Sequence, residues 1–314
     1  MKNFININDL TLTEINKIFE ITKDIKDKLK TGVKEPVLKD KTLGMIFTKS
    51  STRTRVSFEV GTYQLGGYPL FLSSSDIQLG RGETIEDTAK VLSRYVDCIM
   101  IRTFKHTDIE ELAKYSSIPV INGLSDLLHP CQAMADLYTI LEHKNKLSGL
   151  KLCFIGDGNN VANSLLHVCT KVGMDISVAT PTGYECNDLI IKNSMENAKT
   201  SGSKITFTNN PTEAISNSDV VYTDTWISMG QESEKKSKIE EFKKFQINSE
   251  LFSKANENAM FLHCLPAYRG YEVTADVIDG PNSFVFDEAE NRLHVQKSIM
   301  ALLMNKDHFT KSKK

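Results

Sequence analysis

Short apolar runs alternate with helix-length segments along most of the chain. Runs such as residues 43–47 and 98–102 are typical of strands buried on both faces of a sheet. Between them, apolar residues recur at helical spacing. In the first half this pattern predicts strands at 43–47, 68–72, 98–102 and 119–122, and helices at 53–65, 84–95 and 108–115. Such alternation favours a mainly parallel sheet covered by helices.

The same pattern restarts after a long predicted helix at 130–143 and a turn at 147–149. Further strands are predicted at 151–155, 176–179, 204–207, 220–223 and 259–262, and further helices at 163–172, 188–201, 211–215 and 287–304. We therefore expect an α/β protein with two doubly wound parallel-sheet domains and a cleft between them. The first domain is placed at 1–141 and the second at 142–287, with the C-terminal helix, 288–314, packing back onto the first.

Composition narrows the class of protein. The 314 residues suffice for two hydrophobic cores, and the net charge of -2 gives no reason to expect nucleic acid or an anionic membrane as a partner. Apolar runs stay well short of the roughly 20 residues that span a bilayer. The N-terminus carries no signal-peptide pattern, so we expect a cytoplasmic protein. The six cysteines lack paired CxxC spacing, which argues against a zinc site or a disulfide framework.

Polar side chains follow the first predicted strand, in the stretch Ser-Thr-Arg-Thr-Arg at 51–55. The first-turn N–H groups of a helix and its positive dipole end attract anions. Ser51, Thr52 and Thr54 add hydroxyl donors, and Arg53 can hold a phosphate with two hydrogen bonds. A plain helix cap with basic surface residues is the alternative. Because ligands bind at the carboxyl ends of parallel strands, we predict a grip on a small phosphorylated substrate here.

Two further segments extend this predicted anion site. Arg102 ends another strand of the same sheet and should lie at the same edge. In the sequence His129-Pro130-Cys131-Gln132, proline suits the first helical position, which places His129 near the N-cap and Gln132 on the same helix face. A histidine there is disfavoured as a cation, so it should stay neutral and donate an N–H to a carbonyl oxygen. A purely structural histidine is the alternative.

The second half carries its own polar positions. The stretch Gly-Asp-Gly-Asn-Asn at 156–160 lacks the glycine spacing of a dinucleotide loop, and the acid expected about 20 residues later is missing, so NAD is excluded. Asn160 is better suited to hold a polar substrate group. Asp224 ends a predicted strand and could bind an amine.

Two neighbouring segments each have more than one possible interpretation. The strongly charged segment 231–241 is either a surface excursion or a lid. His263-Cys264 could form a Cys–His nucleophile, with a simple buried cysteine as the alternative. Because adjacent positions on a strand point to opposite faces, the nucleophile is disfavoured.

Together these motifs resemble the aspartate/ornithine carbamoyltransferase family over about residues 40–300. The stretch 51–55, with Arg102 and 129–132, resembles the carbamoyl-phosphate site of the whole family. Asp-Thr-Trp-Ile-Ser-Met-Gly at 224–230 resembles the DxxxSMG loop of the ornithine-specific members, and His-Cys-Leu-Pro at 263–266 resembles their HCLP motif. Putrescine-specific members typically differ at SMG and keep HCLP, so the loop is the discriminating feature.

The resemblance implies a role for each matching residue. Carbamoyl phosphate would be bound by Ser51, Thr52, Arg53, Thr54, Gln78, Arg102, His129, Gln132, Cys264, Leu265 and Arg292. L-Ornithine would be bound by Asn160, Asp224, Ser228 and Met229. The catalytic group would comprise Arg53, Thr54, Arg102, His129, Asp224 and Cys264. The first domain would bind carbamoyl phosphate and the second ornithine, without a cofactor or metal, in a homotrimer or a multiple of trimers.

The implied reaction is attack of the ornithine δ-amine on the carbamoyl carbon, giving citrulline and phosphate in arginine biosynthesis. Thr54, Arg102 and His129 would stabilise the oxyanion that forms. Two alternatives stay open: a carbamoyltransferase for another amine, such as putrescine or a modified ornithine, and a non-catalytic relative that only binds ligands.

Overall fold

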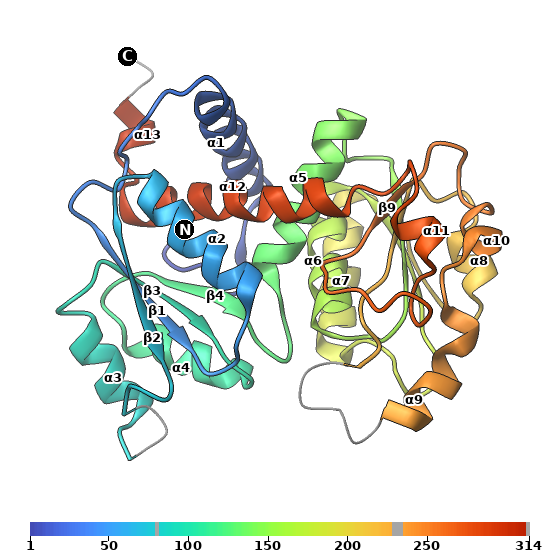
Figure 1. Ribbon diagram of the computed structural model, residues 1–314, viewed down its shortest axis with the longest axis horizontal. Coiled ribbons are helices and arrows are strands. Elements are labelled where there is room, and N and C mark those ends of the chain that lie inside the picture. The colour runs from blue at the N-terminus through green and yellow to red at the C-terminus, as the bar shows by residue number, and fades with distance from the viewer. Residues whose placement is uncertain (79–81, 228–234, 312–314) are drawn as a thin grey trace. The chain divides into compact units, whose positions relative to one another are not determined.

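The computed structural model describes residues 1–78, 82–227 and 235–311. The chain divides into two compact units, Met1–Met134 with Asn291–Lys314, and Ala135–Glu290. The boundaries fall inside two helices, α5 (Pro130–Lys144) and α12 (Val285–Met304) (Figure 1). Each of these helices therefore supplies residues to both units.

The first unit is built on a four-stranded parallel sheet in the order β2-β1-β3-β4. Its strands are β1 (Thr42–Phe47), β2 (Tyr68–Ser73), β3 (Cys98–Arg102) and β4 (Val120–Leu124). Every residue of β3 and β4 is buried, as their apolar sequences predict. Because β1 has neighbours on both sides, its carboxyl end lies in the middle of the sheet.

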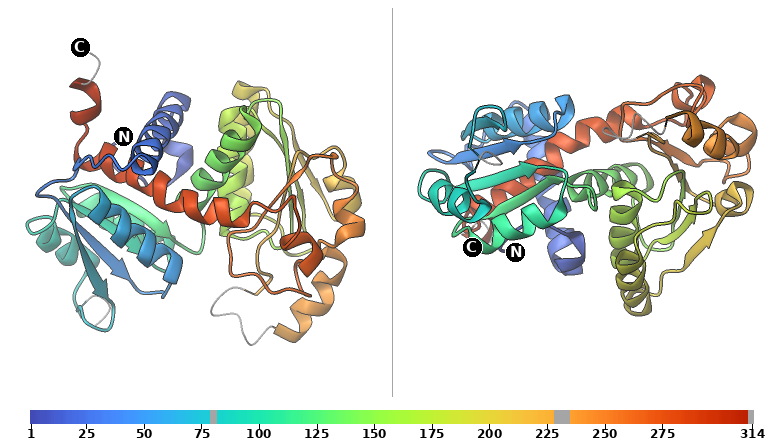
Figure 2. Two further views of the ribbon diagram at one scale, coloured as in Figure 1. Left: turned by 45° about the horizontal axis from the view of Figure 1, so that its top comes forward. Right: turned by 90° about the horizontal axis from the view of Figure 1, so that it is seen from below.

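Helices cover both faces of this sheet (Figure 2). The helices of this unit, besides the parts of α5 and α12 that belong to it, are α1 (Leu12–Lys30), α2 (Thr52–Gln64), α3 (Ile85–Leu92), α4 (His106–Tyr115), α13 (His308–Lys311) and the short 3-10 helix η1 (Ile7–Asp9). α3 and α4 share one core with β1 and β3, through residues such as Ala89, Leu112 and Ile99. α2 packs against α12, where a Cβ on Gly61 would lie 3.2 Å from side-chain atoms of Lys297 and Met300. A larger residue at position 61 would therefore require these side chains to shift by a few tenths of an ångström.

The second unit holds a five-stranded parallel sheet in the order β7-β6-β5-β8-β9. The strands are β5 (Lys151–Ile155), β6 (Asp175–Ala179), β7 (Ile205–Thr208), β8 (Val220–Tyr222) and β9 (Met260–Leu262). The helices are α6 (Asn160–Val172), α7 (Asp188–Ser201), α8 (Pro211–Ile215), α9 (Lys235–Phe242), η3 (Lys243–Phe245), α10 (Ser249–Phe252) and α11 (Ala275–Ile278). β5 is central and connects outward in both directions, which is a doubly wound topology.

The prediction of two parallel-sheet α/β domains is confirmed, and each predicted strand is present with small shifts at its ends. Two helices differ by three residues at one end: α3 ends at Leu92, not at residue 95, and α6 begins at Asn160, not at residue 163. The side chain of Asn159 accepts hydrogen bonds from the N–H groups of Val161 and Ala162, and this cap starts the helix early.

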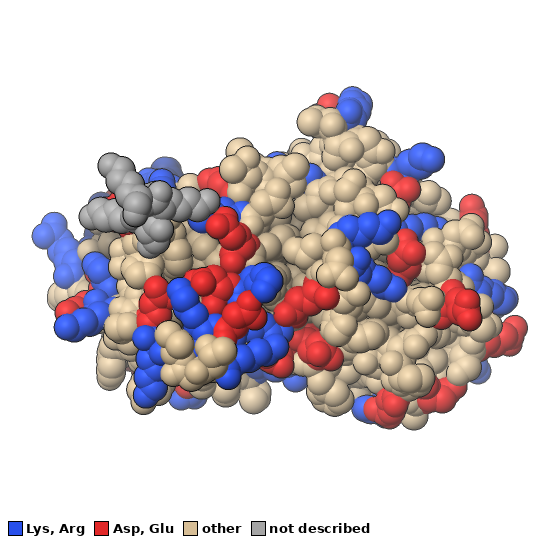
Figure 3. Space-filling model, turned by 90° about the horizontal axis from the view of Figure 1, so that it is seen from above, with Lys and Arg blue, Asp and Glu red and all other residues tan. Residues whose placement is uncertain are grey.

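Acidic and basic side chains are interspersed on the face drawn in Figure 3. Along α1 they form lysine–carboxylate pairs one helical turn apart, such as Lys23 with Asp27 at 2.6 Å. Exposed pairs of this kind contribute little to stability, because solvent screens them. Within the described part of the chain, no helix is long and apolar enough to cross a lipid bilayer.

Candidate active site

In the first unit, the strand order places a topological switch point between β1 and β3, since the chain leaves β1 toward β2 on one side and reaches β3 on the other. Ligands of doubly wound sheets bind beyond the carboxyl ends of strands at such a point. Thr48 follows β1, and its N–H donates to the carbonyl of Arg102 at 3.0 Å. Its hydroxyl donates to that of Thr103 at 3.0 Å. The segment before Ser51 is therefore fixed directly beside Arg102.

The predicted anion site begins where α2 starts. Ser51 caps the helix by accepting a hydrogen bond from the N–H of Thr54 at 3.3 Å. Thr54 is buried, Ser51 and Arg53 are partly buried, and Thr52 is exposed. A cavity of about 470 Å³ lies beside this turn and is lined by Phe47, Thr48, Ser50, Ser51, Thr52, Arg55, Phe71, Ser73 and Ser74. The first turn of α2 can thus present N–H and hydroxyl donors to an anion.

Two buried guanidinium groups converge on the Thr54 hydroxyl. Arg102 donates to its Oγ1 from Nη1 at 3.2 Å, and Arg292 of α12 donates to the same oxygen from Nη2 at 3.3 Å. Arg292 also donates to the side-chain oxygen of Gln132. The two arginines are 5% and 3% exposed. Concentrated positive charge in a poorly solvated place favours binding of an anion.

His129 lies at the start of α5, where its carbonyl accepts from the N–H groups of Gln132 and Ala133. Burial lowers the pKa of its imidazole well below the ordinary value, and the positive charges of Arg292, Arg102, Lys49 and Arg53 lower it further. The prediction that this side chain stays neutral is confirmed, with burial as the largest cause. A neutral imidazole can donate one N–H to a developing oxyanion.

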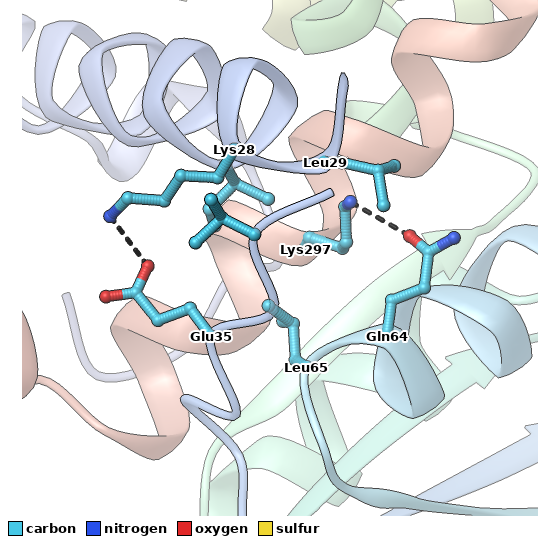
Figure 4. Close-up of a pocket in the computed structure, with 8 residues that line it drawn as sticks. Lys28, Leu29, Glu35, Gln64, Leu65 and Lys297 are labelled. Carbon is cyan, nitrogen blue, oxygen red and sulfur yellow. Dashed lines mark hydrogen bonds and ion pairs between the residues drawn. The ribbon is translucent and has the colours of Figure 1, made fainter. Parts of the chain in front are cut away.

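A second, much smaller pocket of the first unit lies among α1, α2 and α12 (Figure 4). Its volume is about 30 Å³, which is room for roughly one water molecule. Lys28 binds Glu35 at 2.7 Å at one end, and Lys297 binds Gln64 at 2.9 Å at the other. We interpret it as a packing gap between paired polar groups and not as a substrate site.

In the second unit, the switch point lies between β5 and β8. The loop after β5 is tightly fitted: a Cβ on Gly158 would lie 2.4 Å from the backbone N of Cys186, so only glycine is accommodated there. The next residue, Asn159, donates from Nδ2 to Asp224 Oδ2 at 2.8 Å. Asn160 follows as the first residue of α6 and is partly buried. The structure thus brings the predicted Asn160 segment beside Asp224.

Asp224 is the centre of this group. It is 7% exposed, and its Oδ1 accepts from the N–H of Thr225 at 2.7 Å and from the Cys264 thiol at 3.0 Å. Burial raises the pKa of the Cys264 thiol well above its ordinary value, and the neighbouring Asp224 raises it further. The thiol is therefore protonated and acts as a hydrogen-bond donor, not as a thiolate. A carboxylate held this way suits a substrate amine.

His263 does not activate Cys264, although the strand-alternation argument used for that conclusion is wrong. Both residues follow the end of β9, and their ligand atoms lie within 4.8 Å of each other and of Asp224. His263 Nδ1 accepts from the N–H of Leu265 at 2.9 Å, and Nε2 lies 3.2 Å from Glu272 Oε1. Because both ring nitrogens are engaged, His263 offers neither a base for the thiol nor a metal ligand.

The remaining predicted residues have different outcomes. Gln78 is exposed in the segment after β2. Leu265 is partly buried with a φ of 55°, a left-handed conformation that is costly for leucine and is typical of functional turns. Ser228, Met229 and most of the charged segment before α9 lie outside the described residues. Arg55 lines the cavity beside Ser51, but its guanidinium donates to Glu59 at 3.0 Å and stacks over the Phe71 ring.

Sequence reasoning missed Asn159. Its role was open to prediction, because an asparagine directly after a strand and glycine loop is a strong helix N-cap. A capping asparagine still has amide N–H groups to donate, and here they reach Asp224.

Comparison with known protein families decides the classification. Residues 2–142 match the model for the carbamoyl-P binding domain of aspartate/ornithine carbamoyltransferases, and residues 148–303 match the model for their Asp/Orn binding domain. The chain belongs to the aspartate/ornithine carbamoyltransferase family. This confirms the resemblance inferred from its motifs.

Individual members of the aspartate/ornithine carbamoyltransferase family align over nearly the whole chain. An ornithine carbamoyltransferase of Caldicellulosiruptor saccharolyticus is 58% identical over 303 residues, covering 96% of this chain and 98% of the relative. One from Thermococcus kodakarensis is 56% identical over 298 residues, covering 95% of each chain. The solved structure of the Pyrococcus furiosus ornithine carbamoyltransferase superposes with a TM-score of 0.94 at 53% identity, covering 96% of this chain and 97% of that one.

Proposed function

We propose that this enzyme transfers the carbamoyl group of carbamoyl phosphate to the δ-amine of L-ornithine, giving L-citrulline and phosphate. The observation that carries the proposal is the convergence of buried Arg102 and Arg292 on Thr54, directly behind a helix N-terminus. That arrangement suits an acyl phosphate, whose carbonyl must also be polarised. The names of the full-length relatives support ornithine as the acceptor.

In the first unit, the phosphate group is bound by the N-terminus of α2 with Ser51, Thr52 and Arg53. Thr54, Arg102 and neutral His129 donate to the carbonyl oxygen as it becomes an oxyanion. Removing one such donor typically costs about 10²–10³ in rate. Gln132 takes part through its hydrogen bond with Arg292, which keeps that guanidinium directed at Thr54.

In the second unit, Asp224 holds the ornithine amine. Hydrogen bonds from the Cys264 thiol and the Asn159 amide fix the orientation of the Asp224 carboxylate. Asn160, Ser228 and Met229 are proposed to bind the rest of the amino acid. Cys264 and Leu265 are also proposed as carbamoyl-phosphate contacts, and so is Gln78. These assignments follow the family resemblance.

The reaction balances without a redox step. The lone pair of the neutral δ-amine forms a C–N bond to the carbamoyl carbon and gives a tetrahedral oxyanion. The bond from this carbon to the phosphate oxygen then breaks, and phosphate leaves with the electron pair. The additional proton on nitrogen passes to phosphate or water. Binding, orientation and electrostatic stabilisation are what the protein contributes.

A comparison of acceptor amines tests the proposal. Purified enzyme with saturating carbamoyl phosphate is given L-ornithine or putrescine, and the carbamoylated product is measured. We expect a kcat/KM for ornithine that exceeds that for putrescine by at least about tenfold, because the α-amino acid part contributes binding. Preference for putrescine would identify the alternative acceptor, and no product with either amine would favour a ligand-binding relative.

The direction and assembly of the enzyme belong to the same proposal. A structurally similar protein from Campylobacter jejuni is titled an anabolic ornithine carbamoyltransferase, with a TM-score of 0.91 at 44% identity, covering 98% of this chain and all of that one. This similarity supports a biosynthetic role, which we place in the cytoplasm.

We also propose a homotrimer or a multiple of trimers. Val56, Val60 and Tyr63 are exposed on α2, and a subunit contact would cover them. The molar mass from light scattering should equal that of three chains or a multiple of three chains.

A further inference from the structure

Two fully buried carboxyl groups of the second unit have no place in the proposed reaction. Asp136 lies on α5 and Glu288 near the start of α12, and each is 0% exposed. A side-chain hydrogen bond with Asp136 is one of the causes that raise the pKa of Glu288. An ionised carboxylate has no hydrogen to donate, so a hydrogen bond between two carboxyl groups requires a proton on one of them.

Glu288 connects this pair to the ends of two strands. Its Oε1 accepts from the hydroxyl of Tyr222, the last residue of β8, at 3.0 Å. Its Oε2 accepts from the backbone N–H of His263, directly after β9, at 2.9 Å. The chain reaches Asp224 two residues after Tyr222 and Cys264 one residue after His263. One buried carboxyl group therefore holds both strand ends that carry the amine-binding pair.

The surroundings of the pair are short of water and rich in acidic groups. Burial raises the pKa of Glu288 well above its ordinary value, and the charge of Asp136 raises it further. The charges of Asp136 and Glu288 also raise the pKa values of Cys264 and Tyr222 at the strand ends, and the charge of Asp136 raises that of Cys169 on α6. A second negative charge on the pair would be repelled here at low dielectric.

We propose that Asp136 and Glu288 share a single proton and act together as a positioning pair, which holds the Asp224 and Cys264 segments in register for the reaction. The catalytic part of this inference rests on the proposed carbamoyl transfer, whereas the shared proton does not. Glu288 is the contact to the strand ends, and Asp136 keeps it in place through the shared proton.

Proton release on unfolding tests the shared proton. In the unfolded chain both carboxyls ionise above about pH 5, so unfolding at neutral pH should release about one proton from the pair. The folded state binds the additional proton, and stability should therefore decrease as pH rises from about 6 to 8. The pH dependence of the unfolding free energy gives the proton number directly.

The variants for this measurement are Asp136→Asn, Glu288→Gln and the double variant, with exposed Glu257→Gln as a control. The double variant should lose about one released proton relative to wild type, and each single variant should lose no more than that, because the remaining buried carboxyl can keep a proton of its own. No loss in any variant would mean that both groups are ionised. A loss of about two protons in the double variant would mean that each group holds its own proton. Either result overturns the proposal.

Kinetics test the positioning role. Glu288→Leu removes both acceptors and leaves the His263 N–H unsatisfied, whereas Glu288→Gln can still accept at one oxygen. We expect Glu288→Leu to lower kcat about tenfold or more, with recovery of most of that loss in Glu288→Gln. Equal activity of folded Glu288→Leu and wild type would refute positioning. If the leucine variant does not fold, a kcat of Glu288→Gln below a tenth of wild type would refute it instead.

The two kinds of failure are distinguishable. Absence of carbamoyl transfer by the wild-type protein would count against the proposed function, yet the proton numbers would still be measurable. Normal wild-type transfer with unchanged proton release in the variants would count against the acid pair alone.

Discussion

Loss of the Thr54 side-chain oxygen should lower both the stability and the turnover of the enzyme, and Thr54→Val tests this directly. Valine keeps the shape of threonine and replaces the hydroxyl by a methyl group. The change removes the acceptor for Arg102 at 3.2 Å and for Arg292 at 3.3 Å, both of them buried. The two guanidinium groups keep their charge and lose a partner.

The magnitude follows from these two contacts. A hydrogen bond from a charged group contributes about 1.5–3 kcal/mol, and the distances here are at the long end of the normal range. We therefore take the lower value for each contact and expect a loss of about 3 kcal/mol in the free energy of unfolding. Since 1 kcal/mol shifts the melting temperature of a unit of this size by about 2–4 °C, the variant should melt at least about 5 °C lower.

Differential scanning calorimetry of wild type, Thr54→Val and Thr54→Ser measures the effect. Serine keeps the oxygen and should recover most of the stability. In steady-state assays Thr54→Val should also lose about 10²–10³ in kcat, because the hydroxyl is a proposed donor to the oxyanion. A valine variant that melts with wild type and turns over within about threefold of it would refute the role given to this oxygen.

Three further predictions concern the same unit. Arg53→Gly should lower turnover by at least about 10²-fold with an unchanged circular dichroism spectrum. The control variant Arg94→Gly, at an exposed position, should have normal turnover. Near-normal turnover of Arg53→Gly would show that Arg53 takes no part in the mechanism. Inorganic phosphate should raise the melting temperature, because at 100 times its Kd it adds about 2.7 kcal/mol to the free energy of unfolding. A melting temperature unchanged by millimolar phosphate would argue against the anion site. The pKa of His129 lies well below its unfolded value, so the unfolded state binds more protons and stability should fall as pH drops below about 6.5. His129→Gln should flatten this fall in urea titrations, and equal slopes would contradict it.

Sequence patterns predicted the features that depend on neighbouring residues. β3 was predictable because an uninterrupted apolar run suits a strand buried on both faces. The cap at Ser51 was predictable because a hydroxyl residue after a strand satisfies the first N–H groups of a helix. Strand–helix alternation also predicted parallel sheets, whose ligands bind beyond the carboxyl ends of the strands, and Arg102 and Asp224 lie at or just after such ends.

Contacts between distant residues were not predictable from pattern alone. Arg292 reaches Thr54 across 238 positions, and nothing in the helical spacing of α12 points to that partner. The link from Glu288 to Tyr222 spans 66 positions and depends on how α12 packs on the second sheet. Such pairings are set by tertiary packing, which single-sequence periodicity does not contain.

The directions in which side chains point were also not predictable from the sequence. The sequence does not show which of Arg53 and Arg55 points toward the anion site. In the structure, Arg55 is held on the helix surface by Glu59 and the Phe71 ring. The His263–Cys264 geometry was misjudged because the chain leaves the strand before these residues, and Leu265 then adopts a left-handed conformation. Alternation along a strand no longer applies there.

The initial rate of citrulline and phosphate formation from carbamoyl phosphate and L-ornithine tests the central claim most directly. The account predicts that the two products appear together in a ratio of about one to one, because a single C–O bond to phosphate breaks for each C–N bond formed. The rate should depend on both substrates and collapse in Asp224→Asn. Phosphate released without citrulline, or a rate independent of ornithine, would contradict the account.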